Sequence, residues 1–289
     1  MLLATQSDVL FKRVGYKKGI EIIKSAGFDA IDFSSFTAEF YEGDVIKKAK
    51  EIREYADLVG ITFNQAHSPF PTSFFEEDKN SDVFEKTVKA IEVASILGVK
   101  NIIVHPKQHL KYIENDNPAI LKNMNVDFYR SLIPYCKKFN VTVCLENMYQ
   151  MYKENDIWRV TPSTCSSPQE FKEYLDLIDS PYICACLDIG HANMLEHNIP
   201  EFIKTLGEKL VALHVHEAQG NWDFHRAPYI IGNTKWAEVL KALKDINYTG
   251  DLTFEADNTL LRMPNDLLEP TAVFMAKIGR SMINQYNNL

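Results

Sequence analysis

The segment Ile183-Cys184-Ala185-Cys186-Leu187-Asp188 is an unbroken apolar run that ends in a carboxylate. Consecutive apolar residues, as opposed to an alternation of apolar and polar ones, are typical of a parallel strand that is covered on both faces. An aspartate at the end of such a strand is costly to bury alone, because desolvation disfavours its charged form. The segment therefore predicts a strand of a buried parallel sheet with a polar site at its carboxyl end.

The same order of helix, stop and strand recurs along the chain. Gly60 ends a helix predicted from about residue 45 to 58, and a strand is predicted over residues 61–66. Further helices are predicted over residues 17–25 and about 82–97, and further strands over residues 2–5, 30–33, 101–104, 141–145, 183–187, 210–213 and 252–254. Eight such units without a linker predict a closed (β/α)8 TIM barrel, with residues 1–289 as a single domain.

A doubly wound open sheet is the alternative fold. Such sheets usually carry a glycine-rich first turn for a dinucleotide, and the chain has neither G-x-G-x-x-G nor a P-loop, so nucleotide cofactors are not expected. The 289 residues are 46% hydrophobic and 24% charged, an ordinary globular composition. The formal net charge of -8 disfavours partners such as nucleic acids and anionic membranes.

The compartment is expected to be the cytoplasm. No apolar stretch approaches the roughly 18 residues of a membrane helix, and residues 1–6 lack the features of a signal peptide. Of the five cysteines, Cys144, Cys184 and Cys186 sit in apolar runs, and none forms a C-x-x-C pair. This pattern predicts reduced, buried thiols.

Polar residues follow six successive predicted strands, and in a barrel the carboxyl ends of all strands meet at one face. Three converging carboxylates would repel one another, and a divalent cation such as Mn, Zn, Co, Fe or Mg would remove that repulsion. The strongest candidates for its ligands lie on four consecutive strands, and two histidines face them across the mouth. These residues are Glu146, Asp188, His214 and Glu255, then His67 and His105.

A second polar group follows the seventh strand. Asp223 and His225 share a face if their segment is extended, and with His191 they would bind a second cation or substrate hydroxyls. Arg226 is a candidate partner for an anionic substrate group. An ordered loop held by its own hydrogen bonds explains the same residues equally well.

Taken together, these motifs resemble the xylose isomerase-like TIM barrels, a superfamily of sugar and sugar-phosphate isomerases and epimerases. The likeness rests on Leu145-Glu146-Asn147, Leu187-Asp188-Ile189-Gly190-His191, His214-Val215-His216-Glu217, Asp223-Phe224-His225 and Phe254-Glu255. It implies a metal held by Glu146, Asp188, His214 and Glu255, and a small sugar or sugar phosphate as substrate. His67, His105, His191, Asp223, His225 and Arg226 are then the candidate substrate-binding residues, and a homo-oligomer is possible.

The resemblance also implies a reaction. Proton abstraction next to the substrate's carbonyl, through an enediolate stabilised by the cation, would be carried out by one glutamate, and the other would return the proton. Glu146 and Glu255 match those two positions. The epimerases carry an arginine a few residues after the seventh-strand histidine, and here Gly220 stands near that position.

Three alternatives stay open. Endonuclease IV-type apurinic endonucleases bind three zinc ions at positions matching His67, His105, Glu146, Asp188, His191, His214, Asp223, His225 and Glu255, although the acidic chain and its first strand do not fit that branch. A metal-dependent lyase such as an inosose dehydratase would use the same metal and base but expel hydroxide. A non-catalytic sugar-binding barrel would not need two opposed glutamates.

Overall fold

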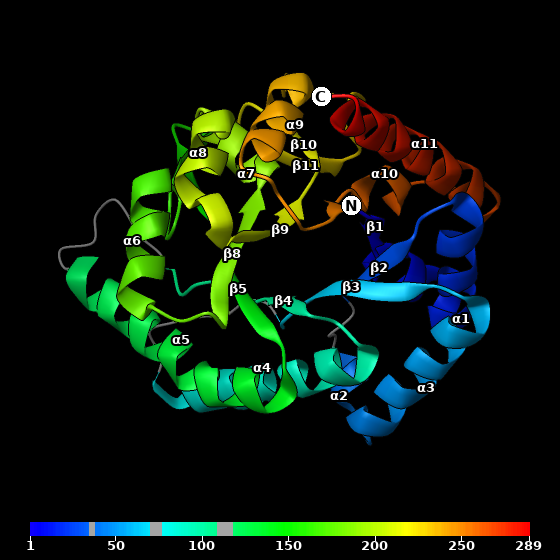
Figure 1. The fold of residues 1–289 in the computed structure, drawn as a ribbon, viewed down its shortest axis with the longest axis horizontal. Helices are drawn as coiled ribbons and strands as arrows, with labels where there is room; N and C mark the ends of the chain where they lie inside the picture. The colour runs from blue at the N-terminus through cyan, green and yellow to red at the C-terminus, as the bar shows by residue number, and fades with distance from the viewer. Residues whose placement is uncertain (35–37, 70–76, 109–117) are drawn as a thin grey trace.

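The computed structural model describes residues 1–34, 38–69, 77–108 and 118–289. Its strands pair in parallel around a barrel, and β1 (Leu3–Gln6) pairs with a neighbouring strand on each side (Figure 1). The strands of the sheet follow the order β12-β1-β2-β3-β4-β5-β8-β9. Their bounds are β2 (Ala30–Phe33), β3 (Thr62–His67), β4 (Asn101–Ile103), β5 (Thr142–Glu146), β8 (Ile183–Asp188), β9 (Leu210–His214) and β12 (Leu252–Phe254).

The ring closes between β9 and β12. Val215, directly after β9, forms a parallel bridge with Phe254. Its amide donates to the Thr253 carbonyl at 2.9 Å, and its carbonyl accepts from the Glu255 amide at 3.2 Å. Closure confirms the predicted TIM barrel and excludes the open doubly wound sheet.

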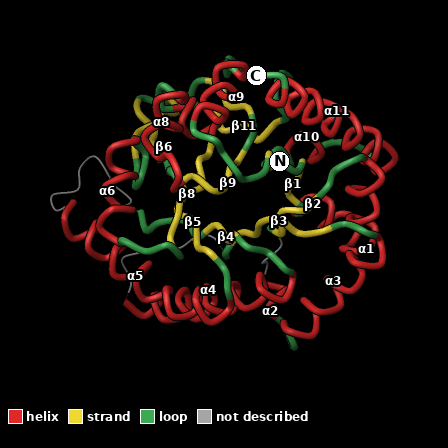
Figure 2. Tube along the Cα trace, viewed as in Figure 1, coloured by secondary structure: helices red, strands yellow, loops and turns green. Residues whose placement is uncertain are grey.

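Helices form a layer outside the strands, as the tube in Figure 2 shows. Gly27 and Gly60 end the first two long helices with φ of 101° and 77°, a left-handed conformation that glycine adopts without strain. The long helices are α1 (Asp8–Ala26), α3 (Val45–Val59), α4 (Glu77–Leu97), α5 (Pro118–Phe139), α6 (Pro168–Ile178), α8 (Ile199–Leu206), α9 (Trp236–Asp245) and α11 (Leu268–Asn287). Shorter ones are α2 (Ala38–Tyr41), α7 (Ile189–Met194), α10 (Asn258–Leu261) and the 3-10 turns Gly207–Lys209 and Asn265–Leu267.

The first helix begins nine residues earlier than the pattern of residues 17–25 predicts, at Asp8. Gly15 interrupts it with φ 78° and ψ 160°, so the apolar periodicity before and after this residue does not join into one helical stripe. Val9, Leu10 and Phe11 in the first turn are nevertheless buried. This early start brings the amino end of α1 to the mouth of the barrel.

Two antiparallel hairpins extend the loops that follow β5 and β9. The first pairs β6 (Tyr149–Glu154) with β7 (Ile157–Pro162), and the second pairs β10 (Glu217–Gln219) with β11 (Trp222–Arg226). The side-chain amide of Asn221 donates to the Trp158 carbonyl at 2.7 Å and joins the two. The hairpins bring Tyr149, Asp223 and His225 toward the carboxyl ends of the barrel strands.

The interior of the barrel contains the thiols that the apolar runs predicted to be buried. Cys144, Cys184 and Cys186 pack with Ile103 and Ala212. Burial raises the pKa of the Cys144 thiol well above its usual value. No helix within the described residues combines the length and hydrophobicity needed to cross a membrane.

Candidate metal centre

Four buried side chains from the ends of neighbouring strands meet at the mouth of the barrel. Glu146, Asp188 and His214 are the last residues of β5, β8 and β9, and Glu255 directly follows β12. One potential ligand atom from each lies within 4.8 Å of the others. The His214 Nδ1 is 3.1 Å from Glu146 Oε1, 3.1 Å from Glu255 Oε2 and 3.7 Å from Asp188 Oδ2. The structure therefore brings together the four residues that the sequence predicted as one group.

The chemistry of this group fits a divalent cation. Three carboxylates and one imidazole, all withdrawn from water, form a donor set that transition metals and magnesium accept. The Glu255 Oε2 atom is buried and accepts no hydrogen bond among the described residues, although His214 Nδ1 lies 3.1 Å away. A buried oxygen in that state costs free energy unless a cation or a donor contacts it. The four residues could thus hold one ion.

Electrostatics keep both glutamates ionised. Burial alone would raise the pKa of Glu146. The neighbouring imidazoles of His214 and His105 lower it by more, so the pKa ends well below its usual value. The pKa of Glu255 is likewise raised by burial and lowered more strongly by neighbouring imidazoles, His214 first, and it also ends well below its usual value. Ionised carboxylates can act as metal ligands and as proton acceptors.

His67 and His105 lie on the far side of the same group, as the order of the strands predicted. His105 Nε2 is 2.8 Å from Glu146 Oε2, and His67 Nε2 is 3.3 Å from Glu255 Oε1. His67 also stacks on His214, with ring centroids 4.5 Å apart, and its Nδ1 lies 3.3 Å from the Asp32 carboxylate. Asp32 was missed from sequence, although a carboxylate inside a predicted apolar strand was a signal for it.

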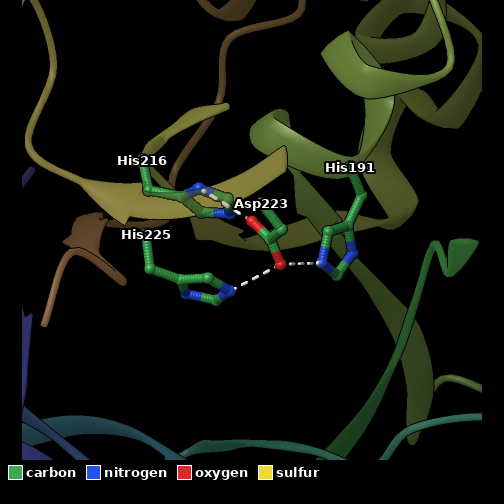
Figure 3. A group of neighbouring side chains, drawn as sticks. All are labelled: His191, His216, Asp223 and His225. Carbon is green, nitrogen blue, oxygen red and sulfur yellow. Dashed lines mark hydrogen bonds and ion pairs between the residues drawn. The ribbon is translucent and has the colours of Figure 1, made fainter. Parts of the chain in front are cut away.

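A second cluster surrounds Asp223 (Figure 3). Asp223 Oδ2 is 2.7 Å from His225 Nε2 and 3.4 Å from His191 Nε2, and its Oδ1 is 3.6 Å from His216 Nδ1. These four residues also offer atoms within 4.8 Å of one another. Burial raises the pKa of Asp223, but His225 and His216 lower it more, so it ends well below the usual value. The structure thus joins Asp223, His225 and His191, as the sequence suggested, and adds His216.

His216 connects the two clusters and was not singled out from sequence. Its Nε2 lies 3.0 Å and 2.9 Å from the two oxygens of Asp188, while its ring stacks on that of His225 at 4.3 Å. His216 comes two residues after His214, and in an extended chain side chains two residues apart point to the same side. The spacing His214-Val215-His216 was therefore a usable signal.

A cavity of about 520 Å³ opens beside the candidate metal centre. Glu255, His67, His105 and His225 line its inner side, and residues of α1 and α10 line its outer side. Arg226 is not part of this lining, and its guanidinium lies over the Phe224 ring at 5.8 Å. Of the candidate substrate-binding residues, His67, His105 and His225 line this cavity, whereas His191, Asp223 and Arg226 do not.

Comparisons with known proteins agree with this architecture. The chain is 27% identical over 259 residues to an uncharacterised protein, MJ1311, of Methanocaldococcus jannaschii, covering 87% of this chain and 83% of that one. It is 25% identical over 261 residues to a D-psicose 3-epimerase of Enterocloster bolteae, covering 83% and 76%. A D-tagatose 3-epimerase-like protein of known structure superposes with a TM-score of 0.78 at 23% identity, covering 100% of this chain and 99% of that one, which supports the fold.

A family model extends the agreement to most of the sequence. The model described as "Xylose isomerase-like TIM barrel" matches residues 20–277, a range that holds all of the strand-end residues of the candidate metal centre. The chain therefore belongs to the xylose isomerase-like TIM barrel family.

Proposed function

We propose that this protein is a divalent-metal-dependent sugar isomerase or epimerase that removes and returns a proton next to a carbonyl. The observation that carries the proposal is the position of two buried glutamates, each with an oxygen 3.1 Å from His214 Nδ1. They come from β5 and β12, which are separated in the barrel by β8 and β9, so they approach the site from different directions. Kinship with a D-psicose 3-epimerase supports a ketose as substrate.

In this proposal Glu146, Asp188, His214 and Glu255 hold the cation. A divalent cation bound there would supply electrophilic stabilisation to the carbonyl oxygen of the substrate. We assign the proton acceptor to Glu255 Oε2, and the hydrogen bond that the side-chain amide of Gln6 donates to the other oxygen, Oε1, at 2.9 Å supports this assignment. The C–H bond breaks, an O–H bond forms on Glu255, and the electron pair enters the substrate's enediolate.

Glu146 then serves as the second acid–base group. It first takes a proton from solvent, and its O–H bond breaks as a new C–H bond forms on the substrate, while Glu255 releases its proton to solvent. Protonation from the opposite face would give an epimer, and transfer along one face would give an aldose from a ketose. We assign the binding of substrate hydroxyls to His191 and His225, and their position around Asp223, next to the glutamates, supports this assignment.

Solvent exchange tests the proposal directly. The protein loaded with Mn²⁺ or Co²⁺ is incubated in deuterated water with D-fructose, D-psicose, D-tagatose, D-ribulose and the matching phosphate esters, and carbon-bound deuterium is followed by NMR. We expect deuterium at a carbon next to the carbonyl of at least one sugar, together with a new epimer or aldose. Absence of exchange across the whole panel would contradict the proposal.

A phosphodiester hydrolase is the second candidate, and one observation favours it. His67, His105 and Glu146 form a further group with atoms within 4.8 Å, next to the candidate metal centre, and the cluster around Asp223 forms another. The net charge of -8 weighs against a polyanionic substrate. Metal analysis separates the candidates: about one ion per chain supports the isomerase, and about three zinc ions with cleavage of abasic DNA support the hydrolase.

A further inference from the structure

The cavity continues past the candidate metal centre to a polar outer wall. This wall is formed by the amino end of α1 and by the segment that joins β12 to α10. Asp8 and Lys12 come from α1, and Asp257 and Asn258 come from the joining segment. A ligand whose reacting end contacts Glu255 would extend its other end toward this wall. The wall is thus placed to decide which substrates enter.

Asp257 is the least satisfied member of the wall. It is 7% exposed, and its Oδ2 accepts from the Val9 amide at 3.0 Å. Its Oδ1 is buried and has no hydrogen-bond partner among the described residues. Asp257 also stands at the amino end of α10 without capping it. The carboxyl group thus keeps an unused hydrogen-bonding atom at the edge of the cavity.

Positive charge in the lining is already matched by negative charge. Lys12 is the one lysine or arginine among the described lining residues, and its Nζ is 2.8 Å from Asp8 Oδ2. The imidazoles on the inner side each contact a carboxylate: His67 contacts Glu255, His105 contacts Glu146, and His225 contacts Asp223. A phosphate on the substrate would meet Asp8 and Asp257 without an unpaired cation to bind it.

We propose that the outer wall binds the uncharged, hydroxyl-bearing end of a free sugar and that Asp8 and Asp257 discriminate against sugar phosphates. The inference rests on the proposed function, because it assigns the substrate class of that same site. Sugar hydroxyls can donate to Asp257 and to the side-chain oxygen of Asn258, whose amide group donates to the Phe224 carbonyl at 3.0 Å. A terminal phosphate would lie beside Asp8 and, above the pKa of Asp257, beside a second negative charge in a partly desolvated cavity, which is unfavourable.

The first test compares each ketose with its own phosphate ester. Deuterium exchange into D-fructose, D-psicose and D-tagatose is measured beside exchange into their 6-phosphates, with the metal-loaded full chain. We expect kcat/KM for the best free sugar to exceed that of its phosphate by at least about tenfold. Equal or faster exchange into the phosphates overturns this inference and leaves the proposed function standing. No exchange into any sugar overturns both.

The second test assigns the discrimination to the wall. Asp8→Asn frees Lys12 from its partner, and Asp257→Asn keeps an acceptor for the Val9 amide while removing a group that is charged above its pKa. Burial raises the pKa of Asp257 to about 7, so the kinetics are measured at pH 8, where this carboxyl group is mostly charged. Each variant is then expected to narrow the ratio of free-sugar to phosphate kcat/KM by about tenfold, because each removes one like charge from the cavity. Asp176→Asn, on the outer helix α6 and paired with Lys172, is the matched control and should keep the wild-type ratio.

The two variants protect the test against a folding defect. Asp8 lies on the partly exposed first turn of α1, so Asp8→Asn is expected to fold even if Asp257→Asn does not. Thermal unfolding of both is recorded beside the kinetics. A wild-type ratio in a folded Asp8→Asn protein overturns the inference, and so does a narrowed ratio in Asp176→Asn.

Discussion

His216 lies directly against the carboxylate of Asp188, with its Nε2 2.9 Å and 3.0 Å from the two oxygens. Both side chains are fully buried. A close approach of the backbone at Gly190 holds the imidazole in this position, because a Cβ there would lie 2.0 Å from His216 Cε1. The contact orients the Asp188 carboxylate, whose Oδ2 also lies 3.7 Å from His214 Nδ1 in the candidate metal centre.

Removing this contact should weaken metal binding. His216→Ala is expected to lower the affinity for Mn²⁺ or Co²⁺ by about 10- to 100-fold. Loss of a residue that hydrogen-bonds to a metal ligand and orients it typically has an effect of that size. Titration calorimetry measures the affinity. His197→Ala is the matched control, because His197 lies outside the candidate metal centre, against the Phe202 ring. An unchanged affinity in His216→Ala would contradict the positioning role.

Gly190→Ala should act on the same contact from the backbone side. The new methyl group collides with the His216 ring, and overpacking of a buried site costs about 1–3 kcal/mol. The free energy of unfolding from urea titration should fall by that amount. In the double variant Gly190→Ala, His216→Ala the collision is gone, so the loss should be smaller than the sum of the two single losses. Additive losses would contradict this account.

Strand ends were the part of the site that sequence could predict. Glu146 and Asp188 end apolar runs, and parallel strands of a barrel place such ends at one face whatever the details of packing. The convergence of the strand-end residues therefore required only the correct fold. The spacing His214-Val215-His216 could place both histidines on one side of the chain, but it could not reveal the contact of His216 with Asp188, because that contact depends on the close approach at Gly190.

The outer wall of the cavity depends on contacts between the two ends of the chain. Val9 donates to Asp257 across a separation of 248 residues. Gly15 breaks the apolar pattern of α1, which hid the early start of that helix and hence the position of Asp8 and Lys12. The hairpins after β5 and β9 were likewise missed, because their exposed strands lack the continuous apolar runs that marked the barrel strands.

Glu255→Gln should abolish exchange while leaving the fold intact. The amide keeps the shape of the side chain but cannot accept a proton at Oε2, and loss of a general base typically costs about 100- to 10,000-fold. The rate of deuterium incorporation measures the loss of exchange, and the far-UV circular dichroism spectrum shows whether the fold is kept. Glu173→Gln, on an exposed pair with Lys122, is the control and should exchange at the wild-type rate. Full activity in Glu255→Gln would exclude it as the base.

Removal of the cation should destabilise the protein. Without it, the three carboxylates of Glu146, Asp188 and Glu255 share one buried site. Dialysis against EDTA should lower Tm, and a divalent cation added at about 100 times its Kd should restore about 2.7 kcal/mol. Asp188→Asn should show a much smaller response, since it loses a charged ligand. If the Tm of the wild-type protein changes neither with EDTA nor with added Mn²⁺, Co²⁺ or Zn²⁺, that result would count against a metal centre.

The ion pair between Asp29 and Arg280 should make stability depend on pH. Arg280 donates to both Asp29 oxygens, at 2.6 Å and 2.7 Å, and this hydrogen bonding lowers the pKa of Asp29 in the folded state. The contribution is therefore fully present above the unfolded pKa of about 3.9 and is lost as pH falls through the lower folded value. Asp29→Asn should cost about 1 kcal/mol at pH 7 and flatten the loss of stability below pH 4. Urea unfolding at several pH values measures this, and Asp57→Asn, in an exposed pair with Arg53, should change the profile far less.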